Sequence, residues 1–124
     1  RKEALILGSG GSSKAIQYAL KNLNINYKIV SRSGNLNYQN LTEEDIITNK
    51  IIINTTPLGM YPNINQFPKI PYHFLSNEHL VYDLIYNPDE TIFLKKSKEM
   101  KCIVKNGFEM LKIQAEESWK IWNN

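Results

Sequence analysis

The sequence contains one cysteine, Cys102, and no long apolar run. A single cysteine excludes an internal disulfide and a cysteine-ligated metal cluster, so we expect no metal site. Its apolar neighbour Ile103 favours a buried, inert thiol over a nucleophile. No stretch approaches the length of a membrane span, and the N-terminus lacks the charged-then-apolar pattern of a secretion signal. These absences predict a cytoplasmic protein without a membrane partner.

Charge of one sign is also scarce. The chain has 15 Lys and Arg residues against 12 Asp and Glu residues, a net charge of +3, and no basic run alternates with aromatic residues. Nucleic-acid binding is therefore not indicated. The 124 residues suffice for one domain, residues 1–124, that buries about two-thirds of its unfolded surface. Its first apolar segment begins almost at the N-terminus, which fits either a minimal domain or one cut from a longer chain.

A glycine-rich turn near the N-terminus is the most informative motif. The apolar residues 4–7 predict a buried strand, and a segment with apolar residues at helical spacing follows the turn. Glycines let the backbone turn sharply, and the first N–H groups of a helix are unpaired at its positive end. This arrangement favours a bound anion, most often the diphosphate of a dinucleotide. We expect contacts from Gly8, Ser9, Gly10, Gly11 and Ser12.

The spacing Gly8-x-Gly10-x-x-Ser13 departs from G-x-G-x-x-G at its last position. By itself, such a turn also serves as a tight strand-to-helix connection that binds nothing. The strand before it and the helix after it are the context that nucleotide binding requires, and they favour the binding interpretation.

Acidic residues are missing from residues 4–42, and this absence bears on the cofactor. In dinucleotide-binding folds, an acidic residue after the second strand holds the free ribose 2′-hydroxyl of NAD. Here the second predicted strand is followed by Ser31, Arg32 and Ser33. A guanidinium and two hydroxyls suit a 2′-phosphate, which indicates NADP rather than NAD. The alternative is an exposed arginine on a solvated loop.

Strands and helices alternate along the chain. We predict strands at 27–30, around Tyr38 and at 51–54, 80–86 and 101–104, a first helix ending near 22–24, further helices at 43–48, 91–100 and 108–122, and a helical turn near 72–75. This order predicts an α/β fold of the Rossmann type, doubly wound, with a mainly parallel sheet flanked by helices on both faces. The loop at 55–60 should line the crevice at the carboxyl ends of the strands, and His73 and His79 should lie exposed in a loop.

The last predicted helix is apolar over more than one face. Phe108, Leu111, Ala115, Trp119 and Trp122 form one stripe, which further apolar residues widen. So much apolar surface predicts a partner, either another domain or a second subunit in a homodimer.

Together these segments resemble the NADP-binding, C-terminal domain of shikimate dehydrogenase. The resemblance runs the whole length of the chain in the family's order. The family motifs G-x-G-G-x-[SA], N-R-T, I-N-A-T-x-x-G-M, D-x-x-Y-x-P-x-x-T-P-x-L and D-G-x-x-M-L-x-x-Q-A are similar to residues 8–13, 31–33, 53–60, 83–94 and 106–115. Ser31 and Ser33 replace the asparagine and threonine of the second motif, Ile92 replaces a proline, and Asn106 replaces an aspartate.

The resemblance implies reversible hydride transfer between NADPH and 3-dehydroshikimate, which gives shikimate in aromatic amino-acid biosynthesis. The family's motifs assign positions at the cofactor and at the substrate. They imply cofactor contacts from Asn54, Thr55, Met60 and Gly107, with Met60 and Gly107 against the nicotinamide. They imply substrate contacts from Tyr86 and Gln114.

The family's catalytic lysine and aspartate belong to an N-terminal domain that is absent from this chain. We therefore predict no catalytic residue here and expect the domain to bind NADP but to be inactive by itself, because proton transfer needs a group within reach of the reacting oxygen. Two alternatives remain: the cofactor domain of a related quinate/shikimate-type reductase, and a non-catalytic NADP-binding module that acts through its last helix.

Overall fold

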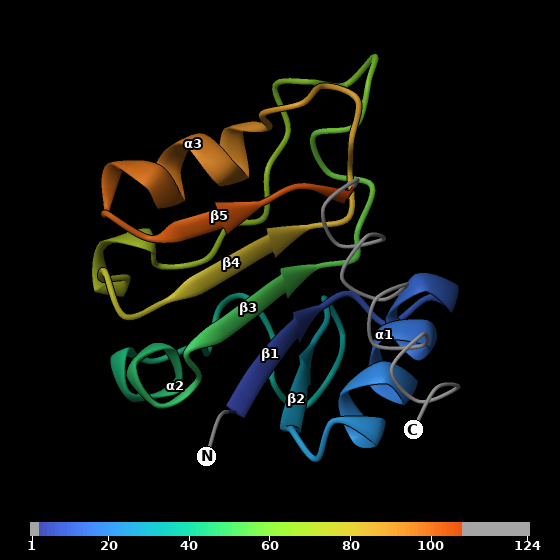
Figure 1. Cartoon of the computed structure of the whole chain (residues 1–124), viewed down its shortest axis with the longest axis vertical. Helices are drawn as coiled ribbons and strands as arrows, with labels where there is room; N and C mark the ends of the chain where they lie inside the picture. The colour runs from blue at the N-terminus through green and yellow to red at the C-terminus, as the bar shows by residue number, and fades with distance from the viewer. Residues whose placement is uncertain (1–2, 108–124) are drawn as a thin grey trace, which may run out of the picture.

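The computed structural model describes residues 3–107, which form one five-stranded sheet with all strands parallel. The strands lie in the order β2-β1-β3-β4-β5 (Figure 1). In chain order the elements are β1 (Glu3–Leu7), α1 (Gly11–Asn22), β2 (Asn26–Val30), α2 (Glu43–Thr48), β3 (Ile51–Asn54), the short helix η1 (Tyr72–Phe74), β4 (Leu80–Asp83), α3 (Ile92–Glu99) and β5 (Ile103–Lys105). The last predicted helix and Gln114 lie outside the described residues.

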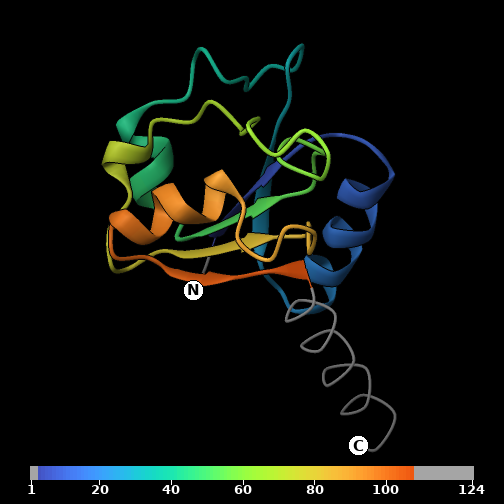
Figure 2. The same cartoon turned by 90° about the horizontal axis from the view of Figure 1, so that it is seen from above.

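Helices cover both faces of the sheet, with α1 on one side and α2 and α3 on the other (Figure 2). Successive side chains of a strand point to opposite faces, so a continuous apolar strand serves two layers at once. On one face, Ala4 and Ile6 of β1 pack with Ile16 and Leu20 of α1. The opposite face packs Leu5, Leu7, Ile52 and Val81 against Ile46 of α2 and Phe93 of α3. The predicted doubly wound α/β fold is confirmed.

The order in which the chain adds strands to the sheet reverses after β2, because β2 and β3 lie on opposite sides of β1. From β1 the chain passes through α1 to β2 on one side, and β3 pairs with the other side of β1, from Ala4–Ile51 to Leu7–Asn54. Because all strands run the same way, the loops after β1, β2, β3 and β4 meet at one edge of the sheet (Figure 1). Ligands of open α/β sheets bind at such a reversal.

The three α-helices begin in different ways. Oγ1 of Thr42 accepts from the N–H of Asp45 at 3.2 Å, and the Asp45 carboxylate accepts from the N–H of Thr42 at 3.0 Å, so a capping box begins α2. The hydroxyl oxygen of Thr91 accepts from the N–H of Leu94 at 3.2 Å and caps α3. No side chain caps α1, whose first residue is Gly11. Its first N–H groups are left for a ligand or water.

Residues 31–42 form turns and bends, so the predicted strand around Tyr38 is wrong. The side chain of Asn37 accepts from the N–H groups of Gln39 and Asn40, both at 3.0 Å. That of Asn40 accepts from the N–H of Asn37 at 2.7 Å. These side chains bond backbone groups that a strand would pair with its neighbour, so asparagine competes with sheet formation here. As a result β2 is an edge strand.

Two further boundaries differ from the predictions. The strand expected at 80–86 ends at Asp83, because the Asp83 carboxylate accepts from the N–H of Ile85 at 3.1 Å and turns the chain out of the sheet. The last strand begins at Ile103 rather than at residue 101, after Lys101 adopts a positive φ of 70°. Tyr86 therefore follows a turn instead of ending a strand.

His79 is buried, with 1% of its surface exposed, so its predicted place in an exposed loop is wrong. Its Nε2 lies 2.7 Å from the carbonyl oxygen of Ile46, and its Nδ1 accepts from the N–H of Ser76 at 3.1 Å. The ring therefore donates from Nε2 to the end of α2 and joins that helix to the start of β4. His73 is exposed, as predicted.

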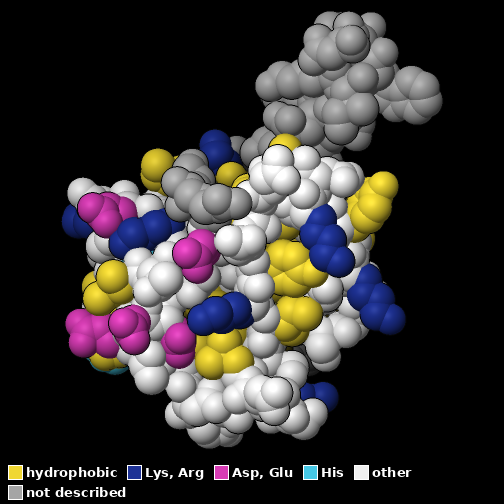
Figure 3. Space-filling view, turned by 90° about the horizontal axis from the view of Figure 1, so that it is seen from below, with side chains coloured by type: hydrophobic (Ala, Val, Ile, Leu, Met, Phe, Trp, Pro, Cys, Tyr) yellow, Lys and Arg dark blue, Asp and Glu magenta, His cyan; other side chains and the backbone are white. Residues whose placement is uncertain are grey.

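Figure 3 shows one face of the molecule in space-filling form. Acidic side chains gather on one side of it, and basic side chains are scattered over the face, some beside acidic ones, without forming a continuous stripe. This face gives no support to a nucleic-acid interface. None of the helices within residues 3–107 is long and apolar enough to cross a membrane.

Candidate functional site

The glycine turn is held between the ends of two strands. The N–H of Gly8 donates to the carbonyl of Val30 in β2 at 2.8 Å. After β3, Thr55 donates to the carbonyl of Leu7 from its N–H at 2.9 Å and from its hydroxyl at 2.7 Å. Gly8 has φ +111°, and a Cβ there would lie 2.6 Å from Oγ1 of Thr55. Only glycine fits this position without displacing the threonine.

The outer side of the turn is open. A Cβ on Gly10 or on Gly11 would meet no atom within 4 Å. The helix that begins here has no side-chain cap and no acidic residue in its first turn. Its unpaired N–H groups and positive dipole end therefore face free space, where an anion is stabilised.

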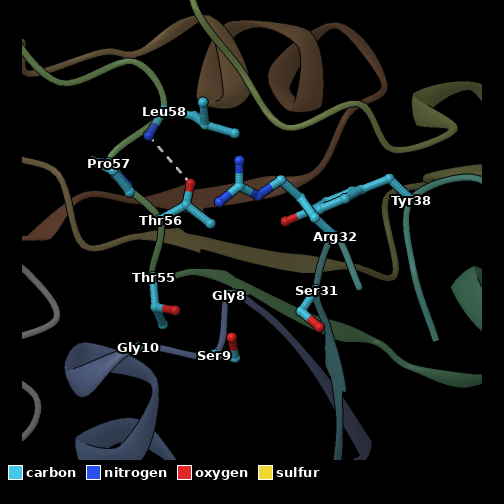
Figure 4. A pocket seen from close by; sticks show the side chains of 10 residues that line it. All are labelled: Gly8, Ser9, Gly10, Ser31, Arg32, Tyr38, Thr55, Thr56, Pro57 and Leu58. Atoms are coloured by element: carbon cyan, nitrogen blue, oxygen red, sulfur yellow. Dashed lines mark hydrogen bonds between the residues drawn. The ribbon is translucent and has the colours of Figure 1, made fainter. Parts of the chain in front are cut away.

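A pocket of about 360 Å³ lies beside this turn at the carboxyl ends of β1, β2 and β3 (Figure 4). The loops after these three strands supply its walls. It is lined by Gly8, Ser9, Gly10, Ser31, Arg32, Tyr38, Thr55, Thr56, Pro57 and Leu58. No carboxylate lines it.

Four side chains of this pocket end in hydrogen-bond donors without a protein acceptor. The guanidinium of Arg32 makes no ion pair, and the hydroxyls of Ser9, Ser31 and Tyr38 make no hydrogen bond, within the described part of the chain. In Figure 4 the side chains of Arg32 and Tyr38 extend into the pocket toward the loop that carries Thr56. A concave site with unpaired donors and no acid suits an anion with several oxygens, such as a phosphate.

The protonation of Tyr38 is set by its surroundings. Burial raises the pKa of its phenol, and the positive charge of Arg32 acts in the opposite direction. Since the ordinary pKa of a tyrosine is 10.0 and burial is the larger effect here, the hydroxyl is protonated at neutral pH and can donate a hydrogen bond.

A second pocket of about 460 Å³ adjoins the first and shares residues 55–57 with it. Three large side chains lie exposed at its rim: Met60, Tyr61 and Tyr86 are 47%, 66% and 65% exposed. The other lining residues are Ser12, Leu84, Ile85 and Asn87. The two pockets together form a continuous crevice along the carboxyl edge of β1 to β4.

A buried polar network lies beneath this crevice. Asn54 is completely buried; its amide donates to the Asp83 carboxylate at 3.1 Å, and its Oδ1 accepts from the N–H and the hydroxyl of Thr56 at 3.0 and 2.6 Å. The hydroxyl of Thr91 donates to the other Asp83 oxygen at 2.6 Å. Burial raises the pKa of Asp83, while its bonds to Thr91, Ile85 and Asn54 lower it. The network fixes the loop after β3 to the start of α3.

Most of the predicted site residues line the crevice. The first pocket contains Gly8, Ser9, Gly10, Ser31 and Arg32, the second contains Ser12, Met60 and Tyr86, and both contain Thr55. Gly11 begins α1 beside it. Ser33, Asn54 and Gly107 line neither pocket. A Cβ on Gly107 would overlap the carbonyl of Leu84, so this glycine lets the end of β5 pack against the loop after β4.

The predictions missed several lining residues. Tyr38 is one of them. The only feature of the sequence that could have pointed to it is that it is a lone aromatic residue in an asparagine-rich segment. Tyr61, Leu84, Ile85 and Asn87 also escaped, because the turns that bring them to the second pocket follow from tertiary packing. No group of three or more His, Cys, Asp or Glu side chains suited to a metal ion occurs within residues 3–107.

No model of a known protein family matches the chain. A curated relative does: the NADP(+)-type shikimate dehydrogenase of Methanococcus aeolicus is 41% identical over 95% of this chain and 48% of its own length. The chain spans about half the length of the curated relatives it matches.

Solved structures agree with this match. A shikimate dehydrogenase in complex with NADP+ has a TM-score of 0.75 and 30% identity, and this chain covers 48% of it. A chorismate mutase/shikimate 5-dehydrogenase fusion protein from Clostridium acetobutylicum has a TM-score of 0.74 and 34% identity, with 47% of it covered. These matches take in 98% and 99% of the present chain.

The parallel sheet, the glycine turn and the crevice at the reversal of the strands define a Rossmann-type domain. The chain is homologous to shikimate dehydrogenases over nearly its whole length and corresponds to the Rossmann-type domain of that family. The resemblance predicted from the motifs is thereby confirmed.

Proposed function

We propose that this chain binds NADP(H) in the crevice and is the cofactor-binding domain of a shikimate dehydrogenase. The observation that carries the proposal is the acid-free pocket in which Arg32 has no ion-pair partner among the described residues. The relatives named as NADP(+)-dependent, and a structural neighbour that contains NADP+, support the same cofactor.

The residues present fit the cofactor. The open side of Gly10 and Gly11 and the uncapped start of α1 suit the diphosphate. Arg32, with the hydroxyls of Ser9 and Ser31, suits the 2′-phosphate of the adenosine half. The second pocket, with Met60 at its rim, is left for the nicotinamide half, and Gly107 lies behind it against Leu84.

The reaction that follows is the reversible reduction of 3-dehydroshikimate to shikimate, in which NADPH supplies the hydride. Tyr86 is exposed at the rim of the second pocket, where its hydroxyl can reach a substrate. Gln114 is proposed for the same role from the family motif alone. No residue of this chain is proposed as the catalytic acid, so the proton for the alkoxide comes from a further domain, and the chain by itself is inactive. A cytoplasmic location and a homodimer stay predictions.

Calorimetric titration of the chain with NADP+ and with NAD+ tests the proposal. We expect NADP+ to bind about tenfold or more tightly than NAD+, because one charge-assisted phosphate contact is worth roughly 1.5–3 kcal/mol. Equal affinities would contradict the assignment of Arg32. Turnover of shikimate and quinate by the full-length protein then separates a shikimate dehydrogenase from a quinate-type reductase, and the absence of turnover on either would favour a non-catalytic NADP-binding module.

A further inference from the structure

The connection from β2 to α2 contributes Tyr38 to the first pocket, in addition to Ser31 and Arg32. Neither the glycine-turn motif nor the Arg32 motif predicts this side chain. Residues 31–42 contain neither a helix nor a strand, yet Tyr38 from the middle of this segment lines the first pocket. It enters from the side opposite to the loop that carries Thr55 and Thr56 (Figure 4).

Tyr38 is held in place by its surroundings. Its ring is half-buried and packs against the core cluster on the α2 and α3 side of the sheet, together with Leu36 and Leu41 from the same segment. The backbone on either side is fixed by the hydrogen bonds between Asn37 and Asn40. A ring anchored in this way reaches the pocket with little loss of conformational freedom when a ligand binds.

The hydroxyl of Tyr38 is free to bind a ligand. It has no hydrogen-bond partner within residues 3–107, and neither does the guanidinium of Arg32 beside it. The charge of Arg32 acts on the titration of Tyr38, which places the two groups within electrostatic reach of each other, while burial keeps the phenol protonated. Two donors that lack acceptors therefore enter one pocket from two different positions of the chain.

We propose that Tyr38 is a second specificity-determining residue for the 2′-phosphate, with its hydroxyl donating to the phosphate that Arg32 holds and its ring forming the wall of the adenosine half of the pocket. This inference rests on the proposed binding of NADP(H). Two donors fixed at separate positions orient the phosphate, whereas the neutral 2′-hydroxyl of NAD gains no charge-assisted bond from either of them.

The test compares Tyr38→Phe with the unaltered chain in calorimetric titrations with NADP+ and NAD+. The substitution removes the hydroxyl and keeps the ring. We expect NADP+ to bind about tenfold more weakly, the size of one hydrogen bond to a charged group, and NAD+ to change less than twofold. Tyr18→Phe is the matched control, because Tyr18 is 70% exposed on α1 and lines neither pocket of the crevice.

The outcomes separate this inference from the proposal on which it depends. An unaltered chain that prefers NADP+, with a Tyr38→Phe variant that keeps the same preference, overturns the role of Tyr38 alone. Equal weakening of NADP+ and NAD+ also overturns it, since a merely structural residue would act on both. An unaltered chain that does not prefer NADP+ contradicts the proposed function and removes the role of Tyr38 with it. Thermal melting shows whether both variants remain folded under the conditions of the titration.

Discussion

The amide of Asn54 donates to the carboxylate of Asp83 at 3.1 Å, beneath the crevice and out of contact with solvent. This bond joins the ends of β3 and β4. Oδ1 of Asn54 accepts hydrogen bonds from the N–H and the hydroxyl of Thr56 in the loop above. The motif that suggested a cofactor contact for Asn54 thus has a structural explanation as well: the residue shapes the loop that lines both pockets.

Replacing Asp83 by asparagine should change how stability depends on pH. Burial holds the folded-state pKa of Asp83 above its ordinary value, so its ionisation is less favourable in the folded chain than in the unfolded chain. Its contribution to stability is therefore fully present below pH about 4 and is lost as pH rises through the folded-state pKa. We expect the free energy of unfolding of the wild-type chain to fall relative to that of Asp83→Asn as pH rises above about 4.

Urea unfolding at several pH values measures this difference. Because asparagine keeps one acceptor for Asn54 and Ile85, the variant should fold, and the comparison concerns only the titration. A difference in unfolding free energy that stays constant with pH would show that Asp83 titrates normally in the folded state, and one that grows in favour of the wild-type chain as pH rises would show that its folded-state pKa is lowered; either result contradicts the prediction.

Alanine at Gly8 should lower stability, whereas alanine at Gly10 should lower cofactor affinity. At Gly8, alanine must adopt φ +111° and move the hydroxyl of Thr55, so we expect a loss of about 1–3 kcal/mol in unfolding free energy. At Gly10, φ is −82° and a Cβ meets open space, so stability should change by less than about 1 kcal/mol. The Gly10 methyl group would occupy the side of the turn proposed for the diphosphate, and NADP+ affinity should fall. Denaturant unfolding measures the stability and calorimetry the affinity. A Gly10→Ala variant that binds NADP+ as tightly as the wild-type chain would argue against a diphosphate at this side of the turn.

Much of the fold was predictable because local and global signals agree. Residues 4–7 and 51–53 are apolar at every position, which is typical of a strand buried between two layers. Thr42 and Asp45 carry the capping signal that starts α2, and the helix lies at the predicted 43–48. The glycine turn and Arg32 were recognisable because each meets a chemical need of the cofactor that few other residues meet.

The errors occurred where side chains satisfy partners that are distant in sequence or compete with the backbone. His79 stands among polar neighbours in the sequence, yet it can be buried because a carbonyl of α2, 33 positions away in the chain, accepts a hydrogen bond from its ring. Tyrosine is common in strands, so Tyr38 suggested one. The side chains of Asn37 and Asn40 bond the local backbone, which therefore does not pair with a neighbouring strand. Ser33 is exposed and lines neither pocket, and its contact with the cofactor stays a prediction from the family motif.

Cys102 should be chemically inert in the folded chain. Its side chain is buried, and burial raises the pKa of the thiol to about 11. The thiolate is the reactive form, so at pH 8 its population is about a hundredfold below that of an ordinary cysteine. We expect a thiol reagent such as dithionitrobenzoate to react at least that much more slowly with the native chain than with the chain in urea. Free cysteine in the same urea solution is the control, and similar native and unfolded rates would disprove the burial of the thiol.

Arg32 should determine the preference of the chain for NADP+ over NAD+. Arg32→Ala removes the only cation that lines the first pocket within the described residues, so NADP+ affinity should fall about ten- to a hundredfold while NAD+ affinity stays within about twofold. Lys28→Ala is the matched control, because Lys28 is an exposed cation on β2 that lines neither pocket of the crevice. Since the contact is between charges at a partly solvated site, the preference of the wild-type chain for NADP+ should also shrink as salt rises, and that of Arg32→Ala should not. A variant that keeps both its preference and its salt dependence would place the 2′-phosphate elsewhere in the crevice.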